Sequence, residues 1–324
     1  MTVDQVEAAL SQLRCHEARA AVRSGVLTLV CVAPDEAGEH GSTPDQALAA
    51  VDGLGARHPA RTVLIIPSGD DGPGSNGGGS GIDASASVHV AQVGERGVCY
   101  EKVVLHVRGK ARFHLDSLIR PLTLSDLPVV IWTPIHLPAA GDPIVDVADR
   151  MLVDTRAAAS GEAVLPDVGR LLRRLPVTDL SWVRLAPWRQ LLAGLFQGKV
   201  NRPFLAGVDQ VEVAGRAAPR HLLAGWLSSR LELGPDRIIL EEATHVSICI
   251  TAHSHGKRGE FAVSRPTDDE IIEARVDIED GPSWTQTLRM QDHWPSRALA
   301  DALTRIGGED AYRDSVVAAT RLMS

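Results

Sequence analysis

Hydrophobic positions in the first half of the chain alternate between a helical pattern and a strand pattern. Apolar side chains recur every three or four residues in 3–13, which is typical of an amphipathic helix. Apolar runs at residues 26–32 and 61–66 have the length of buried strands, and Thr43 and Pro44 between them are typical of a helix start. A strand, a helix and a strand in this order favour a parallel pair joined by a right-handed crossover.

The same alternation continues toward the middle of the chain. We expect further strands at residues 88–93, 100–107, 129–132 and 151–153, and short helices at residues 114–119 and 142–150. Residues 67–81 consist mainly of Gly, Ser, Asp and Pro and predict a mobile loop. The sequence therefore predicts a three-layer N-terminal α/β domain over residues 1–155, with a mostly parallel or mixed sheet.

The second half begins with a helical stretch and continues with an α+β pattern. Residues 156–205 predict a bridging segment of short helices, in which Thr178 or Asp179 caps a turn. We then expect a strand, a helix, an antiparallel meander and two closing helices, at residues 208–213, 220–233, 237–290, 295–306 and 310–322. These elements predict a C-terminal α+β domain over residues 206–324.

Length, composition and charge are those of a globular protein with about two domains. The chain has 324 residues, of which 44% are hydrophobic and 23% charged, and its formal net charge is −8. Because an acidic chain repels phosphate groups, we expect no nucleic-acid partner and no membrane partner. The N-terminal residues lack the pattern of an export signal, and no run of about eighteen apolar residues occurs, so we expect a cytoplasmic protein.

The cysteines give no sign of a disulfide framework. Cys15, Cys31, Cys99 and Cys249 are scattered along the chain and form no C-x-x-C pair. This pattern favours reduced thiols, and it predicts that the protein is not controlled by a thiol switch.

A group of histidines in the second half raises the possibility of a metal site. If residues 244–255 form one strand, then His245, Cys249, His253 and His255 share a face. At about 3.3 Å per residue, His245 lies roughly 26 Å from His253, too far for both to bind one ion. A solvated polar face is therefore favoured over a metal site, and we expect no cofactor.

No motif in the sequence carries a recognisable catalytic chemistry. Gly72, Gly74 and Gly77 match the spacing of a dinucleotide-binding loop, but the helix that such a loop requires does not follow them. The chain also contains no P-loop and no nucleophile elbow. Two functions stay open: a binding protein without catalysis, and a sugar-phosphate- or nucleotide-binding α/β enzyme with its site at the carboxyl ends of the strands.

A basic and aromatic segment at residues 165–205 contrasts with the acidic remainder of the chain. It contains seven basic and two acidic side chains, and Trp182, Trp188 and Phe196 lie among them. Trp and Arg supply much of the binding energy in protein interfaces, but the same pattern also fits an aromatic core with a solvated basic face. The partner-binding candidates are Trp182, Arg184, Trp188, Arg189 and Arg202.

Part of this segment resembles a known family signature. Residues 178–192 read Thr-Asp-Leu-Ser-Trp-Val-Arg-Leu-Ala-Pro-Trp-Arg-Gln-Leu-Leu, which resembles the signature of the OpcA family, the glucose-6-phosphate dehydrogenase assembly proteins of actinobacteria and cyanobacteria. Further resemblances follow the family's order: His-Pro-Ala-Arg, Leu-Pro-Val-Val-Ile-Trp and Leu-Ala-Gly-Trp-Leu, at residues 58–61, 127–132 and 223–227. The chain departs from the family at Ala186, where a Thr often precedes the signature proline, and in its glycine-rich loop, which looks like a local insertion.

The resemblance implies a non-enzymatic accessory protein. Such a protein binds glucose-6-phosphate dehydrogenase, promotes its active oligomer and so controls entry into the oxidative pentose phosphate pathway. This implication agrees with the missing catalytic motif. Only four of the 33 basic residues are lysines, a bias that fits an actinobacterial member.

Overall fold

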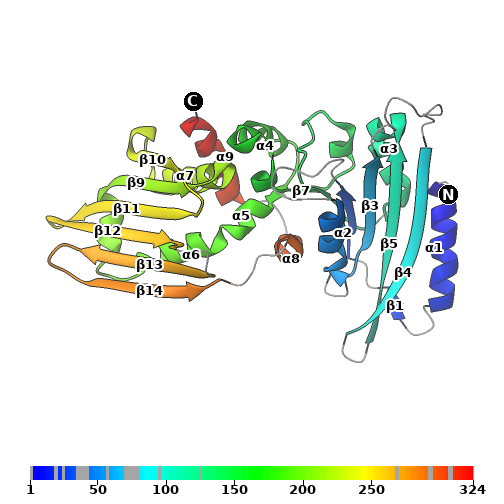
Figure 1. Cartoon of the computed structure of the whole chain (residues 1–324), viewed down its shortest axis with the longest axis horizontal. Coiled ribbons are helices and arrows are strands. Elements are labelled where there is room, and N and C mark those ends of the chain that lie inside the picture. The colour runs from blue at the N-terminus through cyan, green and yellow to red at the C-terminus, as the bar shows by residue number, and fades with distance from the viewer. Residues whose placement is uncertain are drawn as a thin grey trace. The chain divides into compact units, whose positions relative to one another are not determined.

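The computed structural model of the chain divides into two compact units (Figure 1). It describes residues 3–17, 21–23, 26–33, 44–55, 58–68, 81–93, 96–124, 126–158, 160–266, 270–290, 295–305 and 309–323. Unit 1 consists of Met1–Ala159, Arg170–Leu180 and Trp294–Gly307, and unit 2 consists of Ser160–Gly169, Ser181–His293 and Gly308–Ser324. Most of the predicted glycine-rich loop, residues 69–80, lies outside the described residues.

Unit 1 is built around a mixed sheet, which has eight strands in the described part of the chain. The strands are β1 (Ala21–Arg23), β2 (Thr28–Val32), β3 (Arg61–Ser68), β4 (Gly81–Val93), β5 (Arg96–Arg108), β6 (Val129–Thr133), β7 (Arg150–Val153) and β8 (Val177–Asp179). Their order is β1-β5-β3-β2-β6-β7-β8, with parallel neighbours, and β4 pairs antiparallel with β5. The predicted α/β class with a mostly parallel or mixed sheet is confirmed.

The strand order of unit 1 is doubly wound. From β2 the chain moves outward to β3 and β5 on one side, and later to β6, β7 and β8 on the other side. All five residues of β6 are buried, as expected for a parallel strand that is covered on both faces. Helices α1 (Val3–Glu17) and α2 (Pro44–Asp52) lie on opposite sides of the strands β3, β4 and β5 (Figure 1).

A buried arginine joins α1 to this sheet. Arg61, on β3, is only 2% exposed, and its Nε donates to the carboxylate of Glu101 on β5 at 2.7 Å. Its Nη1 donates to the carbonyl of Leu122 at 3.1 Å and forms an ion pair with Glu7 on α1. Because a buried guanidinium is costly without such partners, the arginine of the 58–61 motif has a structural role.

Short helices and one distant helix complete unit 1. They are η2 (Gly109–Phe113), α3 (Leu115–Ile119), η3 (Arg120–Leu122), η4 (Pro143–Asp146), η5 (Thr155–Ala157) and α8 (Pro295–Thr304). The helix predicted at 142–150 is shorter than expected: Asp142 caps η4 by accepting a hydrogen bond from the Ile144 amide at 3.0 Å. Helix α8 is held by Arg150, whose Nη2 donates to the Ala302 carbonyl at 3.2 Å.

The sequence, which predicts that Thr178 or Asp179 caps a turn, did not predict a strand here; Asp179 is also the residue directly before α5 (Leu180–Arg184). Both residues lie in β8, which pairs with β7 at the edge of the sheet. The buried carboxylate of Asp179 accepts hydrogen bonds from the amide and the Oγ1 of Thr155, at 3.1 and 2.7 Å. These contacts come from a segment more than twenty residues away, so no local pattern announces the strand.

Unit 2 contains a sheet with six strands among the described residues, in the order β10-β9-β11-β12-β13-β14. The strands are β9 (Val208–Gly215), β10 (Ile238–Glu242), β11 (Ser247–Ser254), β12 (Lys257–Ser264), β13 (Ile271–Ile278) and β14 (Ser283–Arg289). The strands from β9 and β11 to β14 are antiparallel, which confirms the predicted meander for most of its length. Strand β10 is the exception: it is parallel to β9, because a helix connects the two strands and returns the chain to its starting side.

That connecting helix, α7 (Ala217–Leu231), packs closely against α9 (Asp310–Leu322). Ser315 donates its hydroxyl to the carbonyl of Leu222 at 2.7 Å. A Cβ on Gly225 would lie 2.6 Å from the backbone nitrogen of Ala319, so this position allows no larger residue. The remaining helices here are η6 (Gly161–Val164), α4 (Leu165–Leu171), α5 (Leu180–Arg184), α6 (Ala186–Leu195), η7 (Arg202–Gly207) and η8 (Pro235–Arg237).

Candidate functional site

The two tryptophans of the basic segment belong to the core of unit 2. Trp182 on α5 is 1% exposed and Trp188 on α6 is 6% exposed. Both lie on apolar helix faces whose neighbours, Leu185, Leu192 and Leu195, are buried as well. Of the two interpretations that the sequence left open for these rings, the structure shows the core, and neither ring is available as a surface anchor.

Trp182 is fixed by contacts with three residues. Its Nε1 donates to the Glu309 carboxylate at 2.6 Å, and its ring centroid lies 5.6 Å from that of Tyr312 on α9. The guanidinium of Arg189 covers the ring at 3.3 Å from its centroid, and Arg189 Nη2 donates to the Trp182 carbonyl at 3.1 Å. Arg189 therefore holds α5 against α6, and its charge is engaged in that contact.

The other two arginine candidates lie in different surroundings. Arg184, at the end of α5, is half-buried, whereas Arg202, at the start of η7, is exposed. Of the five candidates, Arg202 is therefore the one that presents most of its side chain to solvent.

Arg202 belongs to an exposed surface that the sequence did not reveal. The turn after α6 and the helix η7 present Lys199, Val200, Arg202 and Leu205, which we call the 199–205 surface. Val200 is 61% exposed and Leu205 36% exposed, so two apolar side chains accompany two positive charges. No periodic pattern marks these residues. The available signal in the sequence was Val200, an apolar residue between the basic residues Lys199 and Arg202.

Buried residues hold the 199–205 surface in place from below. The side-chain amide of Asn201 donates to the carbonyl of Leu195 at 2.7 Å and is buried. The ring of Phe204 packs edge-on against Phe261 on β12, with centroids 5.3 Å apart. Because Asn201 and Phe204 anchor the segment, its backbone needs little further ordering on binding.

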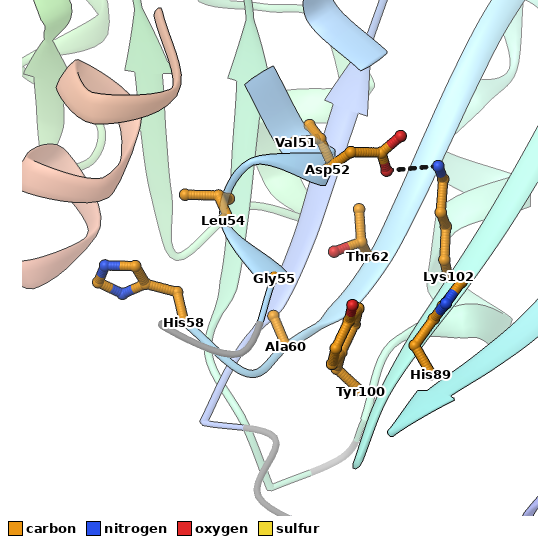
Figure 2. A pocket seen from close by; sticks show the side chains of 10 residues that line it. All are labelled: Val51, Asp52, Leu54, Gly55, His58, Ala60, Thr62, His89, Tyr100 and Lys102. Carbon is orange, nitrogen blue, oxygen red and sulfur yellow. Dashed lines mark hydrogen bonds and ion pairs between the residues drawn. The ribbon is translucent and has the colours of Figure 1, made fainter. Parts of the chain in front are cut away.

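A second candidate is a pocket in unit 1, beside the start of β3 (Figure 2). Its volume is about 270 Å³. It is lined by Val51, Asp52, Leu54, Gly55, His58, Ala60, Thr62, His89, Tyr100 and Lys102. This volume lies just below the roughly 300–1,000 Å³ of typical ligand sites.

The polar groups of the pocket already interact with one another. Lys102 Nζ lies 2.5 Å from Asp52 Oδ1, and His89 stacks on Tyr100 with ring centroids 5.2 Å apart (Figure 2). The pocket lies at the amino end of β3, whereas a doubly wound enzyme would bind its ligand at the carboxyl ends. The loops after β2 and β3, at those carboxyl ends, lie outside the described residues.

The described histidines and cysteines are possible metal ligands. Among the described residues no group of three or more metal-ligating side chains occurs. Strand β11 begins only at Ser247 and ends at Ser254, so His245 and His255 lie outside it, and the predicted row of four residues is not formed.

The thiols described are poorly suited to redox chemistry. Burial raises the pKa of the Cys31 thiol well above its usual range. Burial, and then the charges of Glu260 and Glu212, raise the pKa of Cys249 to about 11. Cys99 is also buried, on β5, and Cys31 lies on β2, with β3 between the two strands.

Two family models match this chain and together span most of it. Both are described as domains of a glucose-6-phosphate dehydrogenase subunit. The model of the N-terminal domain matches residues 51–170, and the model of the C-terminal domain matches residues 175–316. The pocket lies in the first matched region, and the 199–205 surface in the second.

Curated cyanobacterial proteins are similar to the chain over part of their length. A protein of Synechocystis sp., provisionally named OxPP cycle protein OpcA, is 26% identical over 191 residues, which cover 57% of this chain and 39% of that protein. A protein of Nostoc punctiforme with the same name is 27% identical over 195 residues, which cover 57% of this chain and 40% of that protein. The aligned part thus spans well under half the length of these relatives. In the described part of the chain, no helix is long and apolar enough to cross a bilayer.

Proposed function

Because the chain belongs to the OpcA family, we propose that it is a non-enzymatic accessory protein that binds glucose-6-phosphate dehydrogenase. In this proposal it promotes the assembly and activation of the dehydrogenase in the oxidative pentose phosphate pathway. The observation that carries the proposal is the match of both domain models, whose descriptions name this enzyme, along residues 51–170 and 175–316. We expect the protein to act in the cytoplasm, together with its enzyme.

The 199–205 surface is the part of unit 2 that best fits a role in this binding. It combines exposed positive charge with exposed apolar area, and arginine beside apolar side chains is typical of protein interfaces. Arg202 is the residue of this surface that the sequence also predicts as a partner-binding candidate. An acidic patch on the dehydrogenase is the complement that it requires.

The preorganised backbone of this surface supports the same assignment. Ordering a flexible segment costs about 1–2 kcal/mol per residue, which would be subtracted from the binding free energy. Asn201 and Phe204 have already fixed the turn through Leu195 and Phe261. A partner therefore meets a backbone that is already ordered, and only the exposed side chains have still to be ordered on binding.

Binding is tested by size exclusion with light scattering, using this chain and the dehydrogenase of the same organism. The proposal predicts a species that contains both proteins and whose mass exceeds that of the dehydrogenase alone. If the two proteins elute separately at concentrations well above those in the cell, the proposal is contradicted.

The alternative is a sugar-phosphate- or nucleotide-binding α/β enzyme, and the doubly wound order of unit 1 is the observation that favours it. This alternative requires that the chain catalyses a reaction without the dehydrogenase. A ligand-induced rise in melting temperature with glucose 6-phosphate or NADP, without the dehydrogenase present, would favour the alternative. No rise would leave the accessory role as the better explanation.

A further inference from the structure

One edge of the unit 2 sheet is exposed in a way that soluble proteins usually avoid. All seven residues of β14, Ser283–Arg289, are exposed, and β14 is the outermost strand of the sheet, orange in Figure 1. Exposed edges are commonly protected by Lys, Pro, acidic side chains or bulges. The opposite edge strand, β10, carries Glu241 and Glu242, whereas Arg289 is the one charged residue of β14.

The hydrogen bonds between β13 and β14 show which backbone groups face the free edge. The amide of Ile278 donates to the Pro282 carbonyl at 3.2 Å, and the amide of Met290 donates to the Glu270 carbonyl at 2.5 Å. In an antiparallel pair, residues that bond to the neighbour alternate with residues whose amides and carbonyls point away. The even-numbered residues of β14 therefore bond to β13. The odd-numbered residues direct their amides and carbonyls outward.

We propose that β14 pairs with β14 of a second copy of this chain, antiparallel about a two-fold axis at Gln286. In this register Thr285 lies opposite the partner subunit's Thr287, and Ser283 lies opposite the partner subunit's Arg289. These are pairs of odd-numbered residues, so the outward amides and carbonyls of one copy bond those of the other. The two six-stranded sheets become one continuous sheet.

The side chains of β14 complement themselves in the same register. Trp284 faces the partner subunit's Leu288, in a closely spaced pair without backbone hydrogen bonds. In this chain Trp284 is 38% exposed and Leu288 41% exposed. They pair within the sheet with Val276 and Ile272, which are buried, so dimer formation extends an existing apolar layer.

Charge also fits the symmetric pairing. Arg289, whose side chain is 83% exposed, lies opposite the small side chain of the partner subunit's Ser283. Within each copy Ser283 pairs with Asp277 on β13, so a carboxylate lies just beyond it on the same face. No like charges of the two β14 strands meet across the two-fold axis.

A second copy explains the symmetry of this strand better than an unrelated strand does. Pairing with a different protein requires no relation between Trp284 and Leu288 or between Thr285 and Thr287. Here the residues on either side of Gln286 are both threonine, and those two positions away, Trp284 and Leu288, are both apolar, so the strand matches its own reversed copy. This inference does not depend on the proposed function, since it concerns self-association of the chain alone.

Sedimentation velocity on the full chain tests the proposal at a series of micromolar concentrations. The wild-type protein is expected to form a dimer. Gln286→Glu and Gln286→Lys each place two like charges opposite one another at the axis, and each should weaken the dimer roughly tenfold or more. An equimolar mixture of the two variants pairs opposite charges and should restore a dimer. Gln46→Glu and Gln46→Lys, at an exposed position in unit 1, are the matched controls and should dimerise as the wild type does.

A further variant separates loss of pairing from loss of folding. Thr287→Pro removes one outward amide but no bond to β13, so it should abolish the dimer with little change in melting temperature. Three results would each overturn the proposal: a monomeric wild type at every concentration, a dimer that resists both Gln286 substitutions, or a Glu and Lys mixture that stays monomeric. A Thr287→Pro protein that is folded and dimeric would overturn it as well.

Discussion

The guanidinium of Arg189 lies over the ring of Trp182, 3.3 Å from the ring centroid, and also donates to the Trp182 carbonyl. This one pair joins α5 to α6, and Trp182 in turn bonds to Glu309 next to α9. A residue pair that the sequence selects as a partner-binding candidate thus stabilises unit 2.

Replacing Trp182 is therefore expected to unfold the protein or lower its stability severely. Trp182→Ala removes a ring that is 1% exposed, and such changes cost about 3–5 kcal/mol. Arg189→Ala should cost about 1–2 kcal/mol, because it removes the cation–π contact and one hydrogen bond. Urea denaturation of both variants measures these changes. Unchanged midpoints would mean that the Trp182 ring is not packed as described.

Charge reversal on the 199–205 surface should weaken binding without affecting stability. Arg202→Glu and Lys199→Glu are expected to reduce affinity for the dehydrogenase by about tenfold each, because they oppose a complementary acidic patch. Their free energies of unfolding should change by under about 0.5 kcal/mol, since both side chains are exposed.

Arg297→Glu, at an exposed position on α8 in unit 1, is the control for net charge. Isothermal titration against the dehydrogenase compares the three variants. If all three bind like the wild type, another surface makes the contact. If Arg297→Glu loses affinity as much as the others, the effect is one of overall charge.

Acid should destabilise the protein partly through His221. Burial lowers the pKa of His221 below its usual value, and the nearby charge of Arg220 lowers it further, while the hydrogen bond to the Ala217 carbonyl opposes both effects. The unfolded chain then binds a proton near its ordinary pKa of about 6.5 while the folded chain does not. The contribution of His221 to the free energy of unfolding is therefore complete above about pH 6.5. It is lost as the pH falls toward the pKa of His221 in the folded chain.

His221→Asn keeps a donor near the Ala217 carbonyl and removes the titrating group. The stability difference between wild type and variant should shrink as the pH is lowered below about 6.5. Thermal or urea unfolding of both proteins across this range gives the difference. A difference that is constant with pH would show that His221 does not titrate on unfolding.

Mild oxidation should leave activation of the dehydrogenase intact. The pKa of Cys249 is raised to about 11, and burial raises that of Cys31, so little reactive thiolate forms at neutral pH. Cys99→Ser should likewise retain activation. A thiol-specific oxidant that dissociates the complex reversibly, with recovery on reduction, would contradict this expectation.

The sequence predicted best those elements whose own pattern decides their structure. The helix expected at residues 310–322 is α9 (Asp310–Leu322). Apolar residues recur at helical spacing over the whole of this stretch, and such a pattern indicates a helix rather than a strand. The buried strand at 61–66 was found for a similar reason, as the start of β3.

Elements that depend on distant contacts were missed. Strand β8 is three residues long and is fixed by Thr155, and the parallel direction of β10 follows from the path of α7 rather than from its own residues. The choice among the partner-binding candidates also needs contacts that no local pattern shows. A segment rich in tryptophan and arginine has the same composition whether it forms a core or an interface. The two cases differ in burial, which the structure shows: Trp182 is buried and Arg202 is exposed.

The rate of NADP reduction by the dehydrogenase, measured with and without an equimolar amount of this chain, tests the central claim most directly. The accessory role predicts a clear rise in rate with the chain present, no rate with the chain alone, and a smaller rise with Arg202→Glu at the same concentration. An unchanged rate with saturating chain, or NADP reduction by the chain without the dehydrogenase, would contradict it.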